Sequence, residues 1–177
     1  MYIKITLLSV IQLTYSVYYG LVYQRHSNVY PFSSTAQVDL RTTSSRKPIA
    51  FMATATHDQH KLADTQVIVF DNVITNIGEA FVNYTSTFTA PEDGLYTFHT
   101  TILTGKGLET WGYIDVNGTP RVRYNAQGTG KIYASTTQTL IVALVKGDHV
   151  SVRNSGGDGE LYGKHYTSFS GYLVTSI

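Results

Sequence analysis

The stretch that decides the fold runs from Phe70 to Phe98 and reads FDNVITNIGEAFVNYTSTFTAPEDGLYTF. Its aromatic, Asn and Gly residues recur with five, four, six, five, one and one residues between successive members. Those members are Phe70, Asn76, Phe81, Phe88, Gly94, Tyr96 and Phe98. The segment 90–94 (Ala-Pro-Glu-Asp-Gly) is typical of a turn, so the whole pattern predicts short strands that turn into one shared core.

Residues 94–103 alternate cleanly, which is typical of a strand with one buried face. The alternation predicts a core face made by Tyr96, Phe98, Thr100 and Ile102. His99 is expected on the opposite face of the same strand.

The rest of the chain also predicts strands. Asn117-Gly118 is a strong signal for a two-residue hairpin, and it lies between two strand-like segments. Short apolar or alternating runs predict strands at 50–55, 67–70, 113–116, 121–124, 135–145, 149–152 and 169–174. The segment 81–89 carries two more aromatic anchors.

The spacing of these residues resembles the signature of the C1q globular domain, a head domain whose fold is similar to that of tumour necrosis factor (TNF). One position departs from the family pattern: the signature ends with an aromatic residue where this chain has Thr100. We expect a neighbour or a small polar contact to fill the space of the missing ring.

Two later segments also resemble motifs of the C1q family. One contains Gly147 and Asp148, and the other contains Phe169 and Gly171. The resemblance therefore covers residues 49–177. It implies an all-β fold, a ten-stranded antiparallel jelly-roll β-sandwich, and a homotrimer of such domains. The number and spacing of the predicted strands agree with that fold class.

Composition limits the classes of function. The chain has 177 residues, a net charge of +1, 14% charged residues and no Cys. The absence of Cys excludes disulfides, a Cys-based zinc site and a Cys nucleophile. The few basic residues are scattered, so nucleic acid is not an expected partner.

The N-terminus predicts a secretory signal peptide over residues 1–16. Lys4 precedes a mostly apolar run, and Thr14 and Ser16 supply small residues at a cleavage site. After cleavage no membrane span is expected, and the protein would be secreted and extracellular. The alternatives are an uncleaved signal anchor that reaches Tyr23, or a buried strand.

Residues 17–48 are predicted to be a flexible N-terminal segment, rich in Ser and Thr in its second half. They contain no Gly-X-Y repeat, so they predict no collagen stalk. Complement C1q recruits its proteases through such a stalk, so this chain is not expected to do so directly.

The motifs of common enzyme classes are missing, and an enzyme is not expected. The glycine-rich segment 155–159 lacks the ending of a phosphate-binding loop and is predicted to be a mobile loop between the last two strands.

A metal site is a weak prediction. His57 and His60 could share a metal, because imidazole is a common ligand. No cofactor is otherwise expected. The family resemblance leaves calcium possible, with Asp158 and Glu160 as candidate ligands. The basic residue Lys164 stands where acidic or amide residues often occur in the family.

Ligand contacts are predicted on the strand after the hairpin. Arg121 and Arg123 lie on one face of it, with Lys131 further along, and guanidinium groups bind carboxylate or phosphate. An ordinary solvated strand face is the alternative. Trp111, the sole Trp, could stack on a sugar or anchor a core or an interface.

Asn83 and Asn117 each begin an N-glycosylation sequon. The second is the better predicted acceptor, because a hairpin tip is exposed. Neither has to be used.

The resemblance implies a secreted, non-catalytic recognition protein of innate immunity. It would bind microbial surface patterns such as polysaccharide, lipopolysaccharide or peptidoglycan, or other anionic patterns, through a trimeric head. A TNF-like signalling ligand that clusters a cell-surface receptor, and an extracellular scaffold protein, are the alternatives.

Overall fold

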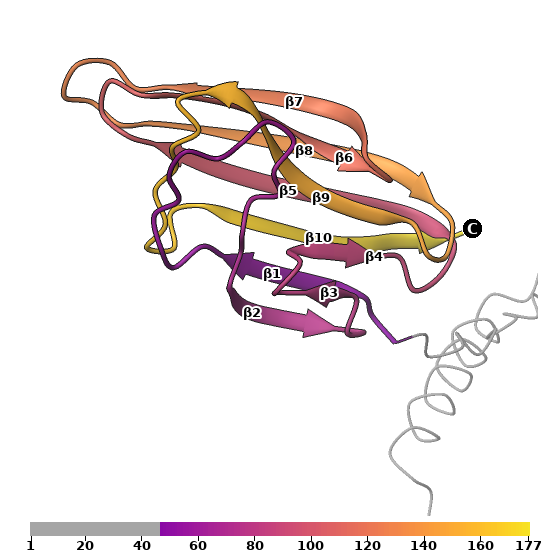
Figure 1. The fold of residues 1–177 in the computed structure, drawn as a ribbon. Coiled ribbons are helices and arrows are strands. Elements are labelled where there is room, and N and C mark those ends of the chain that lie inside the picture. Colours follow the sequence, from indigo (N-terminus) through magenta and orange to yellow (C-terminus); the bar gives the residue numbers. More distant parts are fainter. Residues whose placement is uncertain (1–46) are drawn as a thin grey trace, which may run out of the picture. The chain divides into compact units, whose positions relative to one another are not determined.

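The structure is a computed structural model, and it describes residues 47–177. Ten strands form two five-stranded antiparallel sheets, which confirms the predicted all-β, ten-stranded antiparallel jelly-roll β-sandwich (Figure 1). The first sheet has the order β2-β1-β10-β5-β8, and the second has the order β3-β4-β9-β6-β7. The strands are β1 (Ala50–Thr54), β2 (Asn72–Ile77), β3 (Phe81–Val82), β4 (Thr87–Thr89), β5 (Gly94–Thr104), β6 (Glu109–Val116), β7 (Thr119–Gln127), β8 (Ala134–Leu144), β9 (His149–Gly157) and β10 (Ser168–Ser176).

A cluster of phenylalanine rings fills the space between the two sheets. The Phe51 ring centroid lies 4.6 Å from that of Phe81, 5.4 Å from that of Phe88 and 5.0 Å from that of Phe169. All four side chains are buried. Phe51 and Phe169 come from the first sheet and the other two come from the second, so the cluster fastens the sheets together. Each buried ring contributes about 1.5–3 kcal/mol of transfer free energy.

The residues of the family-like pattern have identifiable structural roles. Asn76 on β2 acts as a polar link between the sheets: its amide donates to the Phe81 carbonyl (2.8 Å) and accepts from the Phe81 N–H (3.1 Å). In the turn between β8 and β9, Gly147 adopts a φ of 93°, which favours glycine. The Asp148 carboxylate closes that turn by accepting the Val145 N–H at 2.9 Å.

Thr100 lies on the core face of β5, as predicted, and is buried. Its Oγ1 donates a hydrogen bond of 2.9 Å to the Ser168 carbonyl on the neighbouring strand β10. The expected small polar contact is therefore present where the family pattern has a ring. His99 lies on the opposite face of β5, which is also confirmed.

The predicted strand at 67–70 is wrong. Within that segment only Val67 pairs, in an isolated bridge to Arg153. Ile68 and Phe70 are nevertheless fully buried, so the apolar run indicates that these side chains lie in the core and does not indicate a paired strand. The Phe70 N–H bonds to the side chain of Ser86 instead of a strand. The regular strand follows as β2, which the sequence reading missed because a bulge breaks its alternation.

The segment 81–89 forms two short strands, β3 and β4, separated by a turn, which agrees with the short strands predicted from its aromatic spacing. One further prediction needs correction. The predicted loop at 155–159 begins as the end of β9, because Gly156 pairs with Trp111 and Gly157 pairs with Thr110. The φ values of these glycines, 137° and 74°, allow the bulge that ends the strand.

The predicted signal peptide (1–16) and nearly all of the predicted flexible segment (17–48) lie outside the described residues. In residues 47–177, no helix has the length and apolar character needed to cross a bilayer.

The charged residues of the strands are divided unequally between the sheets. None of the residues in the five strands of the first sheet is Asp, Glu, Lys or Arg. The strands of the second sheet carry Glu109, Asp115, Arg121, Arg123 and Arg153. The two outer faces of the sandwich therefore differ in chemistry.

Replacement of Gly171 even by Ala is predicted to destabilise the domain. A Cβ at this position would meet Phe98 Cδ1 at 2.5 Å and Phe51 Cε1 at 2.9 Å, inside the phenylalanine cluster. We expect Gly171→Ala to lower the free energy of unfolding by about 1–3 kcal/mol, as other overpacked cores do. Ser170→Ala, on the next residue and the opposite face, is the control. Urea denaturation at fixed protein concentration measures both, and equal stability of the two variants would contradict the prediction.

Candidate functional site

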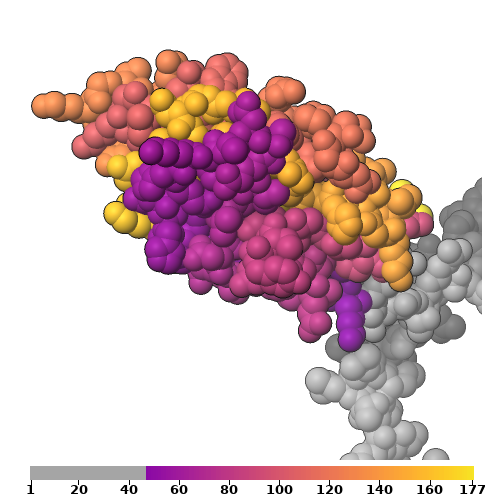
Figure 2. Space-filling model, in the orientation of Figure 1, coloured from indigo at the N-terminus to yellow at the C-terminus, as the bar shows by residue number. Residues whose placement is uncertain are grey.

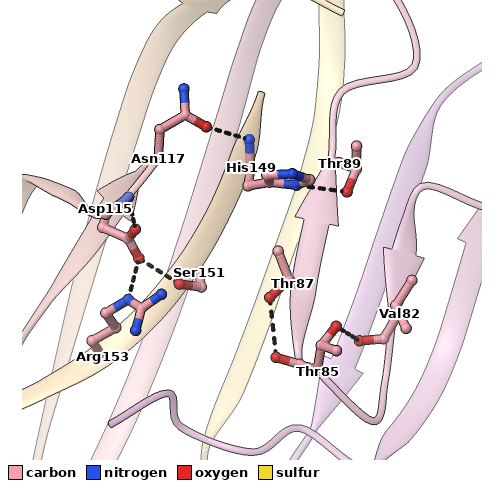
Figure 3. Close-up of a pocket in the computed structure, with 10 residues that line it drawn as sticks. Val82, Thr85, Thr87, Thr89, Asp115, Asn117, His149, Ser151 and Arg153 are labelled. Atoms are coloured by element: carbon pink, nitrogen blue, oxygen red, sulfur yellow. Dashed lines mark hydrogen bonds and ion pairs between the residues drawn. The ribbon is translucent and has the colours of Figure 1, made fainter. Parts of the chain in front are cut away.

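A polar groove lies on the outer face of the second sheet (Figure 3). Strands β4, β6 and β9 form its floor, and the turn between β3 and β4 borders it. Hydroxyl, amide, imidazole and guanidinium groups line it, so it presents both hydrogen-bond donors and acceptors. Figure 2 shows this side of the domain, with the magenta β3–β4 segment beside the gold β9 segment.

Strand register explains why these side chains meet. Thr89 on β4 pairs with His149 on β9, and Ser151 on β9 pairs with Asp115 on β6. Their neighbours along β9, Val150 and others, point into the core. Because side chains alternate along a strand, burying the apolar set places the polar set in the groove.

Asp115 is the centre of the groove and is almost completely buried, with 1% of its surface exposed. Its Oδ1 accepts from Arg153 Nε at 3.1 Å and from the Ser151 hydroxyl, and its Oδ2 accepts from the Gly118 N–H at 2.7 Å. Arg153 also donates from Nη1 to the Thr65 carbonyl at 2.9 Å. A buried carboxylate with this many donors fixes the guanidinium in one position.

The end of the groove near the β6–β7 hairpin is also tightly hydrogen-bonded. Asn117 Nδ2 donates to Asp148 Oδ1 at 2.9 Å, and its Oδ1 accepts the His149 N–H at 2.9 Å. The Asn117 amide is the largest cause that holds the pKa of Asp148 below its ordinary value, followed by the Val145 N–H. Burial opposes this effect, and His149 and Arg121 add smaller electrostatic contributions.

The predicted ligand residues do not form a single cluster. Arg121 and Arg123 are exposed on β7, at the edge of the second sheet. The Arg123 guanidinium lies over the Tyr113 ring, 5.5 Å from its centroid. Arg121 lies near the first residue of β7, whereas Lys131 lies in the turn that follows the last residue of β7. The two residues are therefore at opposite ends of the strand. The residue that shares the outer face with the Arg pair is instead Arg153.

The weak metal candidates are used in other ways. The Asp158 carboxylate accepts the Glu109 N–H at 2.8 Å, and Glu160 pairs with the ring of His60. His57 lies 3.4 Å from Asp71, so the two histidines face different carboxylates. Within residues 47–177, no three His, Asp or Glu side chains gather as a metal site would require.

Trp111 is 45% exposed on β6, so the core alternative for this residue is wrong.

The two asparagines of the sequons differ in their side-chain contacts. Asn83 is exposed in the turn between β3 and β4. The Asn117 side chain is held at both ends of its amide. The hairpin tip at Asn117 is exposed, as expected, but its amide is already hydrogen-bonded, and glycosylation at either position stays a prediction.

Sequence reasoning missed Asp115, Ser151 and Arg153 as site residues. The signal that could have found two of them is the segment 149–153, where polar residues alternate with Val150 and Val152. Asp115 stands in an otherwise apolar segment of β6, and a buried Asp needs a partner. Which partner it has depends on how β6 and β9 pair, which a single sequence does not contain.

An antiparallel two-sheet jelly roll with a polar groove on one outer face defines a ligand-binding or recognition domain. A family model described as "C1q domain" matches residues 50–174. This chain therefore belongs to the C1q domain family.

Curated relatives agree with that assignment. Heavy metal-binding protein HIP of Mytilus edulis is 31% identical over 128 residues, covering 71% of this chain and 60% of its own length. Complement C1q tumor necrosis factor-related protein 3 of Mus musculus is 35% identical over 131 residues, covering 71% of this chain and 51% of its own length. The chain thus spans between half and two thirds of these relatives.

Solved structures share the fold at low sequence identity. The globular domain of zebrafish complement 1qA has a TM-score of 0.58 at 16% identity, covering 73% of this chain and 99% of that domain. Eiger TNF from S. frugiperda has a TM-score of 0.57 at 14% identity, covering 75% of this chain and 96% of its own. The fold is common to the C1q and TNF proteins.

Asp115 is predicted to organise the groove. Asp115→Ala removes the acceptor of three donors and leaves Arg153 uncompensated, so the free energy of unfolding should fall by about 3 kcal/mol. Asp64→Ala, which removes an exposed carboxylate, should change it by no more than about 0.5 kcal/mol. Urea denaturation measures both.

A double-mutant cycle gives the specific test. If Asp115 holds Arg153, then Asp115→Ala should cost less in an Arg153→Ala background than in the native chain. Strictly additive costs would show that the two side chains are not energetically coupled.

Proposed function

We propose that this chain is a secreted recognition protein that assembles as a homotrimer and binds microbial surface polymers through its second sheet. The observation that carries the proposal is the division of charge: the strands of one sheet have no charged residue, and those of the other carry three arginines together with Glu109 and Asp115. Secretion rests on the predicted signal peptide at 1–16 and on the family.

The first sheet has the composition of a protein–protein interface. Strand register places one row of uncharged residues across all five strands, and these are Ile77, Ala50, Tyr172, Thr97 and Ile141. Ile141 is 65% exposed and Tyr172 is 48% exposed in the single chain. Depletion of charge with retention of aliphatic and aromatic residues marks the centre of an interface. We call this surface the charge-free face.

Self-association through the charge-free face accounts for its composition. The family resemblance implies three copies around a three-fold axis. In such a closed ring a neighbouring copy covers the charge-free face of every subunit. Three heads then present three copies of the second sheet to one target. Simultaneous binding raises the apparent affinity for a repetitive surface by orders of magnitude over a single site.

The second sheet supplies the chemistry for an anionic repetitive target. Arg121 and Arg123 on β7 and Arg153 in the groove share its outer face. Guanidinium groups bind carboxylate and phosphate groups in two-pronged geometry, and microbial surface polymers carry both. A polymer that follows β7 from Arg121 would reach Lys131.

The charge-free face is predicted to determine the assembly. Ile141→Lys places a cation in the proposed interface, so the full chain should become monomeric, since an unpaired buried charge is strongly unfavourable. Tyr84→Lys alters another exposed apolar residue, in the turn between β3 and β4, and should remain trimeric. Light scattering at micromolar concentration measures the mass. A monomeric native chain would contradict the proposal.

The arginine pair on β7 is predicted to contribute to ligand binding. Arg121→Ala with Arg123→Ala removes two exposed charge contacts of up to ~1 kcal/mol each, which should weaken binding to lipoteichoic acid roughly tenfold. The unfolding midpoint should not change. Lys146→Ala with Lys164→Ala removes the same charge elsewhere and should have a smaller effect.

The same binding assay separates the candidate functions. Added salt should weaken binding of the native chain to anionic polymers, whereas neutral mannan should bind weakly or not at all. A chain that binds lipoteichoic acid, lipopolysaccharide and peptidoglycan no better than mannan, but saturates on animal cells, would instead support a TNF-like ligand.

A further inference from the structure

Both N-glycosylation sequons of this chain border the same groove. Thr85, the third residue of the first sequon, lines one side, and Asn117 and Gly118 of the second line the other. Figure 3 shows Thr85 and Asn117 at opposite sides of the groove. A glycan at either sequon would therefore stand beside the groove described above.

The folded domain accommodates a glycan unequally at the two positions. Asn117 Nδ2, the atom that would carry the sugar, donates to the Asp148 carboxylate, and Asn117 has a φ of 52°. A sugar on that nitrogen would leave one N–H to donate and would have to fit beside the Asp148 carboxylate at the hairpin end of the groove. Asn117 is therefore the more constrained of the two attachment points.

Asn83 lies in a turn that is anchored to the core, and its side-chain amide is available for attachment of a sugar. Its side-chain amide makes no hydrogen bond to another described residue, and the adjacent Tyr84 is 85% exposed. Its carbonyl accepts from the N–H (3.2 Å) and the hydroxyl (3.0 Å) of Ser86, which is buried. Ser86 Oγ in turn accepts the Phe70 N–H at 2.7 Å. The turn that presents Asn83 is thus anchored to the core.

We propose that Asn83 is the N-glycosylated residue of this domain and that its glycan overhangs the groove and limits access to it. The groove extends from β4 to β6, two interstrand spacings or ~10 Å, which the first sugars of an N-glycan span. The arginine pair on β7 lies at the opposite edge of the sheet from Asn83 and stays uncovered. This inference adds to the proposed function, but it does not depend on any ligand.

The test begins with site occupancy. The full chain is expressed in a eukaryotic host and recovered from its secretory pathway. Glycopeptides are then released enzymatically in heavy-oxygen water, so that each formerly glycosylated Asn is marked by mass. Asn83 should be marked in most molecules and Asn117 in few. A chain marked mainly at Asn117, or at neither position, would overturn the proposal.

Groove access is then measured without a ligand. His149 is exposed in the groove, and diethyl pyrocarbonate modifies accessible neutral imidazoles. Modification of His149 should be several-fold faster in Asn83→Gln than in the native glycoprotein. His57, with 88% of its side chain exposed and outside the groove, is the internal control. Thr85→Ser, which keeps the sequon, should behave like the native chain.

Equal His149 rates in Asn83→Gln and in the native glycoprotein would overturn the role of the glycan in access. Failure of polymer binding would leave both readouts unaffected, because neither uses a polymer. The two proposals can therefore fail separately.

Discussion

Burial of the phenylalanine cluster between the two sheets is the constraint on which the rest of this structure depends. Phe51 from one sheet contacts Phe81 and Phe88 from the other, Phe169 lies against Phe81, and Gly171 leaves the space that the rings of Phe51 and Phe98 occupy. Side chains alternate along strands, so a shift of one residue in register would expose these rings. The cluster therefore determines which residues face outward as well as which are buried.

The outward residues give the two sheets different roles. Once the register is fixed, Ile141 and Tyr172 lie on the charge-free face, and Arg153 and His149 lie in the groove. An uncharged outer face has no evident role in a single sandwich, whereas in an assembly it can be buried as an interface between copies. The opposite face has a buried carboxylate, Asp115, which costs free energy unless it is fully hydrogen-bonded. Hydrogen bonds from Ser151, Gly118 and Arg153 offset that cost, and the bond from Arg153 also holds its guanidinium in the groove.

The sequence predicted the fold well because the fold depends on local spacing. The aromatic pattern from Phe70 to Phe98, the alternation of β5 and the Asn117-Gly118 hairpin are all visible in one chain. The contact that replaces a ring at Thr100 was also foreseeable. The apolar run at 67–70 was misread, because burial without a strand partner has the same sequence pattern as a buried strand.

The site was less predictable because it depends on pairing between distant strands. Arg121 and Arg123 were found from their alternation, but Arg153 and Asp115 meet only because β9 pairs with β6. The hydrogen bonds that occupy Asn117 likewise come from a turn some thirty residues away.

The central claim is that other copies of this chain cover the charge-free face and leave the second sheet uncovered. Hydroxyl-radical footprinting tests it directly on two tyrosines, because radical oxidation follows exposure to solvent. As protein concentration rises through the association range, oxidation of Tyr172 should slow, and oxidation of Tyr84 should not change. Constant oxidation of Tyr172, or protection of Tyr84 alone, would contradict the account.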